Sequence, residues 1–186
     1  VRIAGGFLEG TATKAHDRLY ARCLVLDDGE ARIAITIVDN CVIPRDLLDE
    51  AKDLAQKNTG IPVDRMLMAA THTHSGPITV DYLSNEGDPV VPKTDPGYLR
   101  VLEDGIVEAA VAAHANACPA QVGLAVADAT GVGTNRRDPN GPRDPQVPVL
   151  LAREPASGRP IGCMLVCSMH PTVLHEDSKL VSADFP

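Results

Sequence analysis

The pattern of apolar and polar positions changes several times along the chain, and each change predicts a different element. Two apolar segments, residues 19–26 and 31–38, flank the turn-forming sequence Asp-Asp-Gly-Glu at 27–30, which predicts a β-hairpin. After Pro44, apolar residues recur at helical spacing until Asn-Thr-Gly at 58–60. This spacing predicts a helix that covers one face of a sheet.

The rest of the chain continues with strands and a second helix. Residues 66–70 predict a strand, and residues 75–96, rich in Gly, Pro and Asp without periodicity, predict a lid or a specificity loop. A helix is expected over residues 97–117, with strands over 122–126, 147–152 and 161–168. This order predicts an α/β fold with a mixed β-sheet covered by helices, and no internal domain boundary.

Composition narrows the class of protein. The 186 residues are 44% hydrophobic and 23% charged, which is typical of a globular domain with a real core. A formal charge of −8 argues against a nucleic-acid partner, because phosphate binding needs clustered Lys and Arg. No apolar run is long enough to predict a transmembrane helix. The chain begins at Val1 and reads as a piece trimmed at both ends.

The five cysteines are an odd number, and most lie within apolar runs. We therefore expect buried free thiols. A zinc role for Cys163 and Cys167 with His170 is disfavoured, because structural zinc sites usually take paired cysteines from turns and not from along a strand.

Histidines follow two of the predicted strands. His72 and His74 come directly after the strand at 66–70, where a strand period of two would place both on one face, roughly two rises of ~3.3 Å apart. His170 follows the last apolar strand. Three imidazoles at strand ends indicate a metal site at a sheet edge, and three protein ligands plus water suffice for catalytic zinc. Asp39, at the end of the segment 31–38, either hydrogen-bonds a ligand imidazole or caps its strand.

The sequence resembles the neutral/alkaline ceramidases, zinc amidases that hydrolyse the N-acyl bond of ceramide. The resemblance is carried by Thr-His-Thr-His-Ser-Gly-Pro at 71–77, His-Pro-Thr at 170–172 and Leu-Val-Ser-Ala-Asp at 180–184, with Asn135-Arg136 between them. It covers nearly the whole chain but only the N-terminal half of the family's catalytic domain. Residues 1–186 are thus expected to be the N-terminal portion of a ceramidase-like zinc hydrolase domain.

The resemblance implies a role for each matching residue. His72 and His170 are expected to ligate Zn²⁺, and His74 to hydrogen-bond the substrate or the zinc water. Arg136 is expected to support an oxygen that gains charge during the reaction. The family's remaining ligands, a Glu and a Tyr, lie beyond this chain, so the chain alone is expected to bind metal weakly and to be inactive.

The implied function is zinc-dependent hydrolysis of an N-acyl amide, with ceramide giving sphingosine and a fatty acid. Two alternatives remain open: an amidohydrolase-type metal enzyme acting on another amide, and a non-catalytic ceramidase-like module. The implied partner is a lipid amide, and analogy with the family adds membrane-surface association of the full protein and a secreted or extracytoplasmic location. The oligomeric state is left open.

Overall fold

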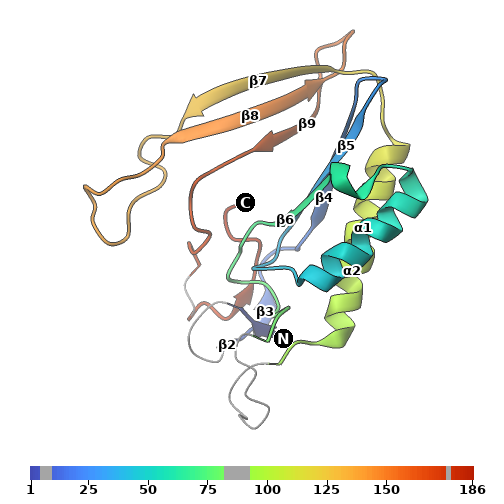
Figure 1. Cartoon of the computed structure of the whole chain (residues 1–186). Coiled ribbons are helices and arrows are strands. Elements are labelled where there is room, and N and C mark those ends of the chain that lie inside the picture. The colour runs from blue at the N-terminus through green and yellow to red at the C-terminus, as the bar shows by residue number, and fades with distance from the viewer. Residues whose placement is uncertain (5–9, 82–92, 175–176) are drawn as a thin grey trace. The chain divides into compact units, whose positions relative to one another are not determined.

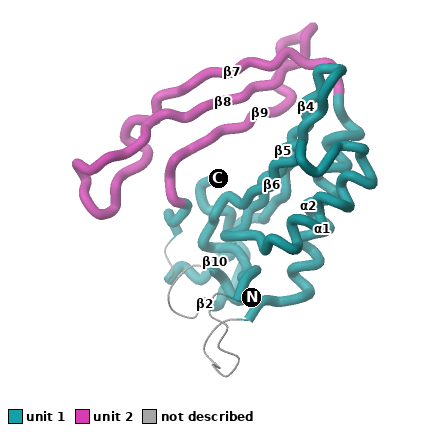
Figure 2. Tube along the Cα trace, viewed as in Figure 1, with its two compact units in different colours: residues 1–117, 171–186 teal, residues 118–170 magenta. Residues whose placement is uncertain are grey.

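A computed structural model describes residues 1–4, 10–81, 93–174 and 177–186. Residues 82–92 of the predicted lid or specificity loop lie outside the described residues. The chain divides into two compact units, residues 1–117 with 171–186, and residues 118–170 (Figure 2). The expectation of one domain portion without an internal boundary stays a prediction.

The first unit is built on a three-stranded mixed sheet, as the sequence predicts. Strands β4 (Ala21–Asp27) and β5 (Arg32–Val38) form the expected antiparallel hairpin, and β5 pairs in parallel with β6 (Met66–Ala70). The hairpin turn is held by Asp28, whose carboxylate accepts from the backbone N–H groups of Glu30 and Ala31. Gly29 has φ +90°, a value that favours glycine.

Two helices pack beside each other against this sheet (Figure 1). Helix α1 (Arg45–Thr59) ends at Gly60 in the left-handed conformation, and α2 (Pro96–Ala115) begins after Asp95, whose carboxylate caps its first turn. Both agree with the predicted helices to within two residues. The core between helices and sheet is aliphatic and rich in alanine: Ala34, Val38, Leu47, Ala51, Ala55, Ile61, Met66, Met68, Leu102, Ile106 and Ala110.

Several short elements of the first unit escaped the sequence analysis. Strand β1 (Arg2–Ile3) pairs antiparallel with β2 (Gly10–Thr11), and β3 (Lys14–Ala15) pairs in parallel with β10 (Leu180–Val181). A short 3₁₀ helix, η1 (Val63–Arg65), precedes β6. The β3–β10 pair joins the beginning of the chain to its end.

The second unit is a separate antiparallel sheet of β7 (Gln121–Asp128), β8 (Gln146–Arg153) and β9 (Pro160–Leu165). Strand β9 ends three residues before the predicted limit at 168. All five cysteines lie in the described residues and form no disulfide, as expected, but the expectation that they are buried is wrong for most of them. Cys41 is buried, whereas Cys118 is exposed in the loop between α2 and β7. Cys163 is exposed on β9, because an apolar run need not lie in a core when one strand face is open. None of the helices in the described parts of the chain combines the length and the apolar character that spanning a bilayer requires.

Candidate metal centre

The parallel pairing of β5 and β6 brings the residues that follow both strands to the same sheet edge. Val38 and Ala70, the last residues of the two strands, are register partners. Beyond them the pairing continues into the loops, since the N–H of Thr71 donates to the carbonyl of Val38 and the N–H of His72 to that of Asn40, each at 2.9 Å. The backbone of His72 is therefore docked onto the loop that leaves β5.

The two histidines of residues 71–77 meet through a turn and not through a strand. Strand β6 ends at Ala70, and His72 adopts φ +69°, a left-handed conformation that a strand cannot contain. The expectation that the strand period of two places His72 and His74 on one face is therefore wrong, because neither residue lies in the strand. The rings nevertheless lie edge to face, with centroids 4.9 Å apart and an interplanar angle of 89°.

The facing nitrogens have a separation suited to a metal ion. The Nε2 atoms of His72 and His74 lie 3.4 Å apart. Two imidazole ligands on a tetrahedral zinc ion, each at ~2.0 to 2.1 Å, have nitrogens about 3.3–3.4 Å apart. A hydrogen bond between the two nitrogens would be long at this distance, because such bonds usually measure about 2.7–3.2 Å. A cation bound to Nε2 of His72 would therefore lie within reach of Nε2 of His74 as well. His72 is exposed and His74 is half-buried.

The other nitrogen of His72 is held by Cys41. Nδ1 of His72 lies 2.8 Å from the carbonyl oxygen of Cys41 and 3.7 Å from its Sγ. Because a carbonyl only accepts, Nδ1 carries the proton, and the lone pair of the neutral ring is on Nε2. This is the arrangement by which proteins fix the tautomer of a metal-ligating histidine.

Cys41 is a neighbour of the site that the sequence analysis missed. Donor atoms of Cys41, His72 and His74 all lie within 4.8 Å of one another, and Cys41 is 4% exposed. A sequence signal for it existed. Cys41 comes three residues after β5, and His72 comes two residues after β6, so parallel strands whose ends coincide bring both to one edge.

The turn after His74 packs closely on the same loop. The δ-amide of Asn40, which is fully buried, donates to the carbonyl of Val42 at 2.8 Å and to Oγ1 of Thr79 at 3.0 Å. A Cβ atom at Gly76 would lie 3.1 Å from Oδ1 of Asn40. Glycine at position 76 therefore allows the two loops to approach each other.

Asp39 is fully buried, and Tyr20 and Arg22 on the hairpin side of the sheet donate to its carboxylate. Its carboxylate accepts from the N–H of Tyr20 at 2.8 Å and from the guanidinium of Arg22 at 2.9 and 3.0 Å. Burial raises the pKa of Asp39, although these donors oppose the rise. Burial, together with the charge of Asp39, raises the pKa of Tyr98 to about 12. These contacts fit the strand-capping alternative, and a role beside a ligand imidazole stays a prediction.

The other two predicted site residues belong to the second unit. Arg136 is exposed in a loop that is organised by Asn135, whose side-chain oxygen accepts from the N–H groups of Arg137 and Asp138 at 3.0 and 3.2 Å. His170 is the last residue of the second unit. The convergence of Arg136 and His170 with the other two histidines stays a prediction.

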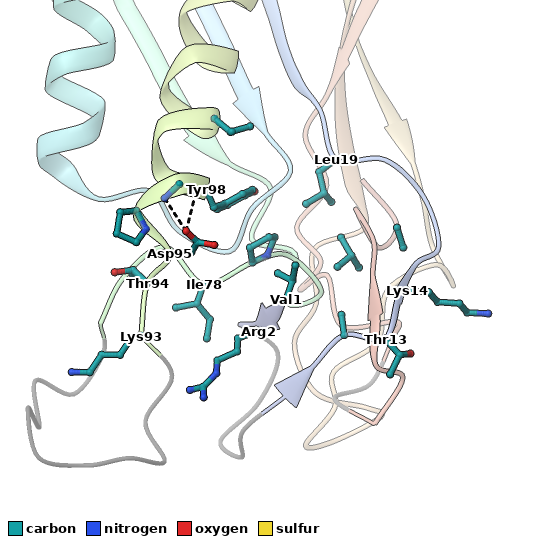
Figure 3. A pocket seen from close by; sticks show the side chains of 17 residues that line it. Val1, Arg2, Thr13, Lys14, Leu19, Ile78, Lys93, Thr94, Asp95 and Tyr98 are labelled. Carbon is teal, nitrogen blue, oxygen red and sulfur yellow. Dashed lines mark hydrogen bonds between the residues drawn. The ribbon is translucent and has the colours of Figure 1, made fainter.

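A cavity of about 970 Å³ occurs elsewhere in the first unit (Figure 3). Its described lining comes from the N-terminal strands, Pro77, Ile78 and the beginning of α2, and contains neither His72 nor His74. Figure 3 shows Lys14 pointing away from Lys93, so the charges of these two lysines do not converge on one point. The chemistry is therefore assigned from the histidine donors and not from this cavity.

Comparison with known proteins identifies the family. The profile described as neutral/alkaline non-lysosomal ceramidase, N-terminal, matches residues 6–185. A neutral ceramidase of Mycobacterium tuberculosis is 30% identical over 151 residues, covering 69% of this chain and 22% of the relative. Neutral ceramidase A of Dictyostelium discoideum is 25% identical over 185 residues, covering 91% and 26%.

Solved structures agree in fold. A ceramidase complexed with C2 superposes with a TM-score of 0.80 at 21% identity, covering 98% of this chain and 31% of that one. The neutral ceramidase from Pseudomonas aeruginosa gives 0.79 at 21%, covering 98% and 32%. The chain spans about a quarter of the length of the curated relatives and about a third of these solved chains. The chain belongs to the neutral/alkaline non-lysosomal ceramidase family and matches its N-terminal part.

Proposed function

We propose that the parent protein is a zinc-dependent amide hydrolase that cleaves the N-acyl bond of a ceramide-like lipid, giving sphingosine and a fatty acid. The observation that carries the proposal is the His72–His74 pair, whose Nε2 atoms are 3.4 Å apart while the Cys41 carbonyl holds Nδ1 of His72. Membership of the ceramidase family supports the choice of an N-acyl amide as substrate.

The residues present fit a zinc ion. Neutral imidazole nitrogen is a preferred zinc donor, and the tautomer of His72 places its lone pair on Nε2, the nitrogen that faces His74. We assign His72 and His170 as ligands within this chain, with further ligands from the rest of the parent protein. Zinc, when bound, polarises the scissile carbonyl and lowers the pKa of a water molecule towards ~7.

His170 is assigned as a zinc ligand because the residue that follows it lies next to His74. Pro171, the residue after it, belongs to the first unit, and its carbonyl oxygen lies 3.5 Å from the backbone nitrogen of His74. His170 is therefore one residue away in the chain from a segment whose backbone contacts the backbone of His74. This continuity supports the ligand assignment.

His74 and Arg136 are assigned to the substrate. In the reaction, the C–N bond of the amide breaks, a C–O bond forms from water, and the amine leaves with a proton. Nε2 of His74, beside Nε2 of His72, can hold that proton or hydrogen-bond the substrate. The guanidinium of Arg136 would orient the substrate oxygen that gains negative charge, an effect worth about 3–4 kcal/mol for a well-placed donor.

The fold favours this reading over an amidohydrolase-type barrel. The sheet that carries His72 contains the antiparallel β4/β5 pair, whereas the strands of such barrels are all parallel. The likeness to two ceramidase chains points in the same direction.

The test uses the full-length parent protein. We expect His72→Ala to lose stoichiometric zinc and hydrolysis of an N-acyl sphingosine, because a ligand is removed. His114→Gln is the matched control, since His114 lies in the last turn of α2, and it should retain both properties. Zinc retention together with full activity in His72→Ala would contradict the proposal. A folded wild-type protein that binds no zinc and cleaves no amide would favour the non-catalytic module.

A further inference from the structure

Residues 182–184, here called the tie segment, contact two loops that are distant in sequence. One is the first loop, residues 71–77, which carries His72 and His74. The other is the second loop, residues 171–174, which directly follows His170. All of these contacts lie within the first unit.

Ser182 fixes the first loop through both of its backbone groups. Its carbonyl accepts from Oγ1 of Thr73 at 2.9 Å, and its N–H donates to the carbonyl of Ser75 at 3.0 Å. Thr73, Ser75 and Ser182 are 0%, 2% and 1% exposed. Because Thr73 and Ser75 stand on either side of His74, these buried bonds set the position of the His74 backbone.

Asp184 fixes the second loop through its side chain. One carboxylate oxygen accepts from the N–H of Val173 at 3.1 Å, and the other accepts from the N–H of Leu174 at 2.7 Å. These donors lie three and four residues after His170. A carboxylate that accepts two backbone N–H bonds forms charge-assisted hydrogen bonds, which are stronger than those between neutral groups.

The tie segment is itself anchored to the start of the chain. Ser182 Oγ and the N–H of Ala183 donate to the carboxylate of Asp17, and Ser182 Oγ accepts from the N–H of Asp184. Burial alone would raise the pKa of Asp17, but the hydrogen bonds from Ser182, Ala183 and His16 hold it below its ordinary value. Asp17 is therefore an anionic acceptor at neutral pH.

We infer that Asp184 is a positioning residue of the metal centre, which holds the loop after His170 in register with the loop that carries His72 and His74. The inference rests on the proposed zinc site, because the alignment of these two loops would position the residues of that site. In this inference Asp184 acts through the backbone N–H groups of Val173 and Leu174 and is assigned no contact with substrate or metal. Outer residues that orient metal ligands typically influence metal affinity or activity by about 10–100-fold.

The backbone conformation of Asp184 determines which substitutions can test its carboxylate without straining the chain. Its φ is +68°, so glycine at this position removes the carboxylate while relieving the backbone conformation. Asparagine also tolerates this region and keeps one acceptor oxygen. Asp28 offers a matched control, since its carboxylate also accepts two backbone N–H bonds, from Glu30 and Ala31, in the exposed hairpin turn.

The experiment compares Asp184→Gly, Asp184→Asn and Asp28→Asn in the full-length parent protein. Zinc affinity is measured by competition with a chelator, and kcat and KM are measured on an N-acyl sphingosine. We expect both Asp184 variants to lose about tenfold or more in zinc affinity and kcat, with KM nearly unchanged, while Asp28→Asn matches the wild type. Amide exchange should show faster exchange at Val173 and Leu174 in the Asp184 variants only.

The outcomes separate the two proposals. If the wild type binds zinc and hydrolyses amide, and the Asp184 variants do so equally well, the inference is overturned while the proposed function stands. If Asp28→Asn lost as much zinc affinity and kcat as the Asp184 variants, the losses would reflect general destabilisation, and the inference would also be overturned. If the wild type shows neither zinc binding nor hydrolysis, the proposed function fails and the inference falls with it.

Discussion

Replacing Thr73 by valine tests whether its hydroxyl holds the first loop. Valine has the shape of threonine but lacks the Oγ1 that donates to the carbonyl of Ser182 at 2.9 Å and accepts from the N–H of Ser75 at 3.2 Å. Both partners are backbone groups of residues no more than 2% exposed, so water cannot easily replace the hydroxyl. Leaving two such groups unpaired costs about 1–3 kcal/mol each, so we expect a total loss of about 2–6 kcal/mol.

Thr73→Ser is the control, because serine keeps the hydroxyl and loses one methyl group, worth about 1 kcal/mol. The free energy of unfolding is measured by urea denaturation of the full-length parent, and amide exchange at Ser75 reports local opening. Thr73→Val should be clearly less stable than Thr73→Ser and should lose protection at Ser75. If valine costs no more than serine, the hydroxyl does not support the loop and the reasoning is refuted.

Two further predictions concern the core and the buried acid. Ile106 is 0% exposed on α2, so Ile106→Ala should lower the free energy of unfolding by about 2–4 kcal/mol and Ile106→Val by about 1 kcal/mol, measured in urea; equal losses would contradict the packing. Burial raises the pKa of Asp39 above 3.8, so the unfolded chain ionises first. The stability that Asp39 contributes is present below about pH 4 and is lost as the pH rises through its folded pKa. As the pH rises from about 4, the free energy of unfolding of the wild type, measured in urea relative to that of Asp39→Asn, should therefore fall. A rise in this difference would contradict a raised pKa for Asp39.

Periodic segments of the fold could be predicted from the sequence. The hairpin of β4 and β5 was found from its apolar runs and its Asp-Asp-Gly-Glu turn, and α1 from its spacing and Gly60. Each of these elements is long enough to show a period. The pairing of β3 with β10 is different, because strands of two residues have no period and their partners are 166 positions apart. Only the folded chain reveals that contact.

The candidate site was predicted in part, and its geometry was not. The sequence singles out the histidines because they follow apolar strands and match a family motif. The family assignment is confirmed, and the roles of the histidines stay predictions. The strand period gave the wrong reason for the contact between His72 and His74, because no local pattern signals that His72 leaves the strand conformation. Cys41 was missed because its position shortly after β5 points to the site only when the β5–β6 register is known, and that register is a tertiary property.

The left-handed conformation of His72 shows how the surrounding bonds determine the site. A non-glycine residue in a sparsely populated backbone region costs about 1–3 kcal/mol and persists only where its neighbours fix it. Here the N–H of His72 is bound to the carbonyl of Asn40 and the ring Nδ1 to that of Cys41, so backbone and side chain are both held by the loop after β5. Glycine would remove the strain but also the imidazole. The strained backbone of His72 is therefore best understood as the conformation that turns its Nε2 towards Nε2 of His74.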